Sequence, residues 1–228
     1  MNNRTVGVDG GREGAAGTVF YALFLATILL VIFYPETLLK HKLIVGGINL
    51  TPLSTLAPFT ILAFLWFAVS RARELRPRLF DLFFIGAMAY ILIHTALIAE
   101  ASLELRLAGQ YAGLGIAMYY GGALLMKNPG RLALFIRVMV IALGVVSTYE
   151  IISTLIQSDP IYGGIPTRDL SQFRGGSTLL HPVYLGGYLL QAVPFAIYAM
   201  YYDNSTRFRR FAQAVLVITA LAALFSYS

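Results

Sequence analysis

The residue types best suited to binding chemistry occur together in one stretch, residues 172–188. Arg174 supplies a planar guanidinium that can hold a phosphate group through two parallel hydrogen bonds. Gly175 and Gly176 follow directly, and glycines allow a sharp turn that presents backbone N–H groups to an anion. Because Pro182 suits the first turn of a helix, whose N-terminus carries a partial positive charge, the stretch predicts a site for a lipid-linked phosphate or diphosphate. The alternative is that the arginine contacts ordinary phospholipid head groups while the glycines only form a turn.

One carboxyl group, that of Glu150, lies inside an apolar segment that is predicted to be helical over 132–156. At a rise of about 1.5 Å per residue it is roughly 9 Å from the outer end of that helix. A carboxylate inside a membrane is costly and marks a candidate functional residue, with Arg168 or Arg174 as its partner. The alternative is an interfacial side chain that extends to the membrane surface.

The remaining residue types give no legible catalytic or metal centre. The chain has three histidines and no cysteine. These histidines show neither the spacing of a metal site nor that of a Ser–His–Asp arrangement. We therefore predict no metal and no cofactor, and the catalytic residues stay unassigned.

The composition requires membrane helices to position these residues. Only 12% of the residues are charged and 58% are apolar or aromatic, whereas soluble domains average about 25% charged residues, so a soluble globular domain is excluded. The apolar segments are about 20 residues long, which is the length of a transmembrane helix and not of a barrel strand. We predict an all-α, polytopic integral membrane protein with about seven transmembrane helices in a single domain over 1–228. The segments are 18–34, 53–69, 79–99, 108–126, 132–156, 183–202 and 211–228.

The placement of lysine and arginine predicts the orientation. With the N-terminus inside, the predicted inner segments carry eleven Lys and Arg residues and the outer segments carry five, and inner loops are normally the richer in these residues. The arginine cluster at 71–78 is the strongest inner marker, and the longest loop, 157–182, is then outside. Because the net charge of +6 comes from clusters beside apolar segments, it favours membrane lipids as partners and not nucleic acid.

The stretch RGGSTLLHPVYLGGYL, residues 174–189, resembles the arginine–glycine–small–x–x–His/Asn–Pro segment of the O-antigen ligase/polymerase family. In that family the segment likewise follows an outer loop and opens a transmembrane helix. The ending LFSYS, residues 224–228, is similar to the end of the family's next helix. By this resemblance His181 joins the arginine–glycine–glycine motif as a substrate-binding position.

The resemblance implies an inverting glycosyltransferase of the C type, a multi-pass protein of the bacterial inner membrane. Such a protein transfers a glycan from a polyprenyl diphosphate donor to a hydroxyl group of a lipid or glycan acceptor at the outer face. In that family a large outer loop with a proposed catalytic histidine follows the helix at which this chain stops. Since the apolar segment also ends abruptly at Ser228, we expect the N-terminal part of a larger enzyme, inactive alone. Alternatives are a peptidoglycan polymerase of similar architecture, a secondary transporter and a non-enzymatic membrane scaffold.

Overall fold

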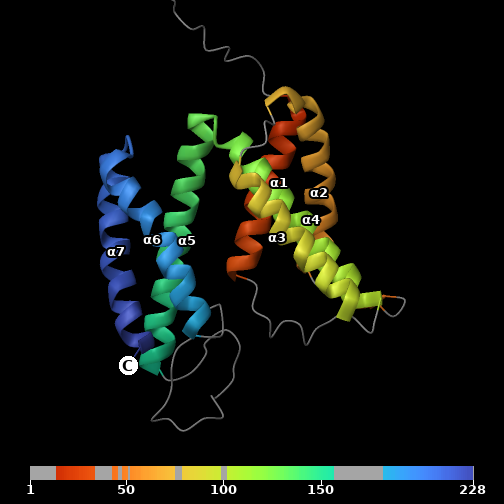
Figure 1. Cartoon of the computed structure of the whole chain (residues 1–228). Helices are drawn as coiled ribbons and strands as arrows, with labels where there is room; N and C mark the ends of the chain where they lie inside the picture. The colour runs from red at the N-terminus through yellow and green to blue at the C-terminus, as the bar shows by residue number, and fades with distance from the viewer. Residues whose placement is uncertain are drawn as a thin grey trace, which may run out of the picture. The chain divides into compact units, whose positions relative to one another are not determined.

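The computed structural model describes residues 14–33, 43–45, 48–50, 52–74, 79–98, 102–156 and 182–227 (Figure 1). Within these ranges the chain forms seven α-helices, which confirms the predicted all-α fold class. They are α1 (Ala15–Phe33), α2 (Pro52–Ser70), α3 (Leu79–Ile98), α4 (Ser102–Leu125), α5 (Pro129–Ile156), α6 (Pro182–Tyr202) and α7 (Thr206–Tyr227). A short 3-10 helix, η2 (Ala72–Glu74), follows α2. An antiparallel hairpin of two short strands, β1 (Leu43–Val45) and β2 (Ile48–Leu50), lies in a region that the sequence patterns leave unassigned.

Four of the helices are long and apolar enough to cross a membrane, as predicted for a membrane protein. They are α1, α2, α5 and, over Thr206–Phe225, α7. Helices α3 and α4 contain shorter apolar stretches, Asp81–Leu97 and Ala112–Leu125. Large apolar side chains such as those of Phe83 and Leu190 are exposed on the helix surfaces, as expected where helices face lipid. Membrane crossing by α3, α4 and α6 and the N-inside orientation stay predictions.

The helices belong to two compact units. Unit 1 comprises Met1–Ala26 and Ser54–Leu125, and therefore contains most of α1 together with α2, α3 and α4. Unit 2 comprises Thr27–Leu53 and Met126–Ser228, and therefore contains the end of α1, the hairpin and helices α5, α6 and α7. The single domain over 1–228 stays a prediction.

Unit 1 is packed around aromatic rings. Phe20 of α1 is fully buried, and its ring stacks on that of Phe67 of α2 with 5.6 Å between the centroids. Gly121 of α4 leaves space for the Phe20 ring, because a Cβ atom at this position would meet the ring. Helix α3 is joined to α4 by the Tyr119 hydroxyl, which donates a 3.0 Å hydrogen bond to the buried carboxylate of Asp81.

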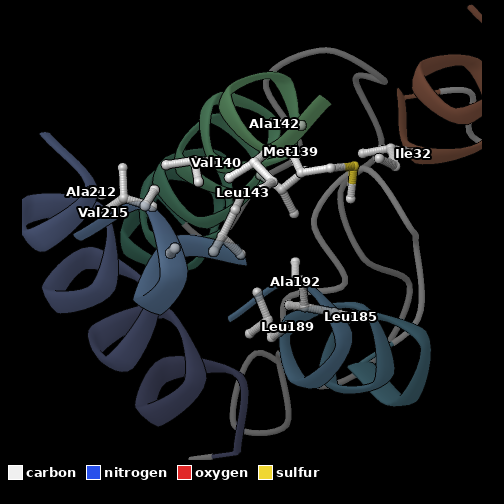
Figure 2. Close-up of a cluster of buried hydrophobic side chains, with 14 residues drawn as sticks. Ile32, Met139, Val140, Ala142, Leu143, Leu185, Leu189, Ala192, Ala212 and Val215 are labelled. Carbon is white, nitrogen blue, oxygen red and sulfur yellow. The ribbon is translucent and has the colours of Figure 1, made fainter. Parts of the chain in front are cut away.

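The core of unit 2 lies between α5, α6 and α7 (Figure 2). On α6 the buried residues recur every three or four positions, as on one face of a helix. They are Leu185, Leu189, Ala192, Ala196 and Ala199. The same cluster takes residues from α5, α7 and the end of α1, among them Val140, Leu143, Ala212, Val215 and Ile32. Small residues let membrane helices approach closely, so van der Waals packing holds this unit together.

Polar residues begin α5 and α7. The side-chain oxygen of Asn128 accepts hydrogen bonds from the backbone N–H groups of Gly130 at 2.8 Å and Arg131 at 3.2 Å. The Ser205 hydroxyl accepts one from the N–H group of Phe208 at 3.3 Å. These N-caps satisfy backbone donors that the first helical turn leaves unpaired. Both helices therefore begin before the apolar segments that the sequence predicts.

The orientation can be tested with single cysteines, because the chain has none of its own. We expect Arg207→Cys, an exposed position at the start of α7, to be protected from a membrane-impermeant maleimide in intact cells. Ser158→Cys, in the predicted outer loop, should react. After cell lysis both cysteines should be labelled. Labelling of Arg207→Cys with protection of Ser158→Cys in intact cells would show that the predicted orientation is inverted.

Candidate functional site

Five of the predicted substrate-binding residues lie outside the residues that the structure describes. So does the predicted loop 157–182, apart from Pro182. The five residues are Arg168, Arg174, Gly175, Gly176 and His181. The structure does describe the two helices that border them, since α5 ends at Ile156 and α6 begins at Pro182. Pro182 thus occupies the first helical position, as the sequence predicts.

Glu150 is described, and its side chain is fully buried in α5. The carboxyl oxygen Oε1 accepts a 3.4 Å hydrogen bond from the hydroxyl of Thr154, one turn further along the helix. The Ser153 hydroxyl donates a 3.0 Å hydrogen bond to the backbone carbonyl of Glu150. The carboxyl group is enclosed by protein and does not extend to the protein surface. Its part in substrate binding stays a prediction.

A second buried polar contact joins α5 to α7. The hydroxyl oxygens of Ser147 and Thr219 are 3.0 Å apart, within hydrogen-bond distance, and both residues are buried. Ser147 precedes Glu150 by three residues, so the two side chains lie on one face of α5. The spacing of Ser147 and Glu150 along α5 is visible in the sequence. The partner of Ser147 is not, because Thr219 is 72 residues further along the chain.

Helices α5 and α6 run antiparallel within unit 2 (Figure 1). Arg137, near the start of α5, pairs with Asp203, just after the end of α6. The opposite helix ends, which border the predicted outer loop, therefore lie at the other end of the unit. Glu150 is six residues before the end of α5, about 9 Å along the helix axis. The buried carboxyl group thus lies towards the end of unit 2 at which α5 ends and α6 begins.

The Arg137–Asp203 pair is bidentate. Arg137 Nε donates to Asp203 Oδ2 at 2.8 Å, and Nη2 donates to Oδ1 at 2.9 Å. The guanidinium also lies over the ring of Phe208, 5.4 Å from its centroid, in a cation–π contact. The carboxylate side chain is only 6% exposed, whereas that of the arginine is 41% exposed. The sequence places Arg137 near the inner end of a helix, but a partner 66 residues away cannot be read from it.

The carboxylate of Asp203 is held in its charged form. Hydrogen bonds from Arg137 keep the pKa of the Asp203 carboxyl below its ordinary value, against the effect of burial. The backbone N–H of Ser205, 2.7 Å from Oδ1, and the positive charge of Arg209 act in the same direction. The ion pair is therefore intact throughout the physiological pH range.

A cavity of about 200 Å³ lies beside this ion pair. It is lined by the start of α5, the end of α6 and the turn that follows. Its polar and exposed lining includes Pro129, Ala133, Arg137, Tyr198, Tyr202 and Asn204. The cavity is at the opposite end of α5 from Glu150, and the sequence patterns do not predict it.

No protein-family model, curated protein or solved structure matches the chain.

Proposed function

We propose that this chain binds a polyprenyl-diphosphate-linked glycan and acts in glycan transfer, as a bacterial inner-membrane protein of the O-antigen ligase/polymerase type. The observation that carries the proposal is the motif at 174–189, in which phosphate-binding residue types directly precede a helix. In support, α6 begins at Pro182, where the motif requires a helix to open. The acceptor would be a hydroxyl group of a lipid or a second glycan.

The helical half of the motif is fixed in place by packing. Leu185 and Leu189 are buried in the core of unit 2, against α5 and α7. A helix N-terminus that is held rigidly presents its unpaired N–H groups to an anion without further ordering. Gly176 is six residues before Pro182, and six residues reach at most about 20 Å.

Glu150 suits the glycan better than the diphosphate. A carboxylate repels a diphosphate, whereas it accepts hydrogen bonds from sugar hydroxyl groups. Its place in α5, at the end of unit 2 where α5 ends, supports a role beside the first sugar. Because the carboxyl group is enclosed by protein, contact with the sugar would require its side chain to turn towards that end. In this proposal the arginine holds the diphosphate and the carboxyl group orients the glycan.

The proposal is tested by the affinity of the purified protein in nanodiscs for undecaprenyl-diphosphate-linked sugar. A charge-assisted contact contributes about 1.5–3 kcal/mol, so Arg174→Ala should weaken binding roughly ten- to a hundredfold. Arg174→Lys keeps the charge but loses the planar fork, and it should restore only part of this affinity. Gly176→Val should also weaken binding, because a β-branched residue resists the sharp turn.

Arg106→Ala is the matched control, since Arg106 is a predicted outer arginine outside the motif. It should leave donor affinity within about threefold of the parent. If Arg174→Lys binds like the parent and Arg174→Ala loses less than threefold, Arg174 only contacts bulk lipid. That result would end the proposal.

A further inference from the structure

The cavity beside Arg137 and Asp203 has the features of a ligand site of its own, separate from the proposed glycan site. Its volume of about 200 Å³ is large enough for a phosphate group with its ester substituents. In Figure 1 the start of α5, the end of α6 and the start of α7 lie at the same end of unit 2. Two N-capped helix starts therefore meet near the cavity.

Arg137 is held so that one side of its guanidinium stays available. Nε and Nη2 bind Asp203, and Phe208 covers a face of the guanidinium. Among the described residues Arg137 has no further hydrogen-bond partner, so its Nη1 group has both N–H donors to offer. The side chain is 41% exposed and lines the cavity. The ion pair thus orients the arginine without enclosing it.

The charge around the cavity favours an anion. Within 126–137 and 198–210 there are six basic residues and one acidic residue, Asp203. The basic residues are Lys127, Arg131, Arg137, Arg207, Arg209 and Arg210. The positive charge of Arg209 also acts at this end of unit 2, since it stabilises the charged form of Asp203. A phosphate group would be attracted by this excess of positive charge.

The surface next to the cavity is suited to lipid chains. Leu134 and Ile141 are exposed on the face of α5 that also carries Arg137, three and four residues away. On α6 the exposed Ile197 adjoins Tyr198, which lines the cavity together with Tyr202. Exposed tyrosines of this kind mark the head-group level of a membrane. An arginine on an otherwise lipid-facing stripe at that level is placed to meet a head group.

We propose that this cavity binds the phosphate head group of an anionic phospholipid from the surrounding leaflet. The acyl chains would lie along the exposed apolar stripes of α5 and α6. By the orientation predicted from lysine and arginine placement, this is the inner leaflet. The site is separate from the polyprenyl-diphosphate site, which the Arg174 series tests at the other end of unit 2.

The test fills the cavity while leaving the ion pair in place. Ala133 lines the cavity and is exposed, so Ala133→Trp should block the opening without disturbing the core. Dihexanoyl-phosphatidylglycerol is titrated into the purified full chain in detergent. We expect Ala133→Trp to weaken its binding at least tenfold. Ala214→Trp, an exposed position on α7 outside the lining, should change it less than threefold.

A second pair of variants separates the specific arginine from general charge. Arg137→Gln and Arg210→Gln remove the same charge, but Arg137 lines the cavity and Arg210 does not. Arg137→Gln should lose at least tenfold in phosphatidylglycerol affinity and Arg210→Gln less than threefold. If Arg137→Gln does not fold, the Ala133→Trp result decides alone.

Two comparison ligands identify the source of the phosphate. Dihexanoyl-phosphatidylcholine, which is zwitterionic, should bind at least tenfold more weakly than phosphatidylglycerol. Inorganic phosphate should not displace phosphatidylglycerol at equal concentration. Equal binding of the two lipids, displacement by inorganic phosphate, or no effect of Ala133→Trp would each overturn the proposal.

Discussion

Leu143→Ala in α5 is expected to lower the free energy of unfolding by about 2–5 kcal/mol, towards the lower end of that range. Leu143 is fully buried in the core of unit 2. In a water-soluble protein such a substitution loses two contributions to stability. One is the free energy of transferring the side chain out of water, and the other is that of its packing contacts. In a membrane the transfer contribution is small, because lipid is as apolar as leucine. What remains is the cavity and the lost dispersion contacts, which the closely packed alanines of α6 cannot move to fill.

Ile141→Ala is the matched control for this prediction. It removes the same number of carbon atoms from the same helix, but Ile141 is exposed. Lipid can occupy the space that it leaves, so the expected change is within about 0.5 kcal/mol. Unfolding by sodium dodecyl sulfate in mixed micelles, followed by circular dichroism, measures both variants. Equal destabilisation by the two would show that the core of unit 2 does not contain Leu143.

Gly121→Ala in α4 is expected to destabilise unit 1 by about 1–3 kcal/mol. Alanine has the higher helix propensity, which alone would favour the variant by about 1 kcal/mol. However, the added Cβ would meet the ring of Phe20. That ring is fully buried and stacked on Phe67, so it cannot swing away as a flexible side chain would. Overpacking therefore outweighs propensity, and the sign of the effect is reversed.

Gly109→Ala in the same helix separates the two contributions. Among the described residues, no atom outside the adjacent backbone of α4 lies within 4 Å of a Cβ at Gly109, so only the gain in helix propensity is left. We expect this variant to be as stable as the parent or slightly more stable. Fluorescence of Trp66, the only tryptophan of the chain and a residue of α2, reports unfolding of unit 1. A stabilising Gly121→Ala would mean that α1 and α4 do not pack through Phe20.

The helices were predictable because most of each helix is apolar, and a long apolar stretch is visible in the hydropathy of the sequence. Their beginnings were less predictable, because helices continue into polar flanks. Helix α4 begins at Ser102, ahead of the predicted 108–126, and its first turns include Glu104 and Arg106. Helix α7 begins at Thr206, through a cluster of arginines. A hydrogen-bonded cap decides such a start, and hydropathy does not report caps.

The candidate site was predictable only in part. Pro182 and Glu150 lie where the sequence predicts them, at the start of α6 and inside α5. The Arg137–Asp203 pair and its cavity could not be predicted, because their positions depend on how α5, α6 and α7 pack. Single-helix patterns carry no information about which polar side chains of different helices will meet.

The hydroxyl contact between Ser147 and Thr219 has a consequence for how the protein is made. In hydrocarbon a buried hydroxyl group without a partner is unfavourable, so each residue favours the arrangement in which it finds the other. Helix α5 leaves the ribosome well before α7, and during that interval Ser147 has only its own helix backbone to bond. The arrival of α7 supplies the missing hydroxyl and sets the rotation of α7 about its axis.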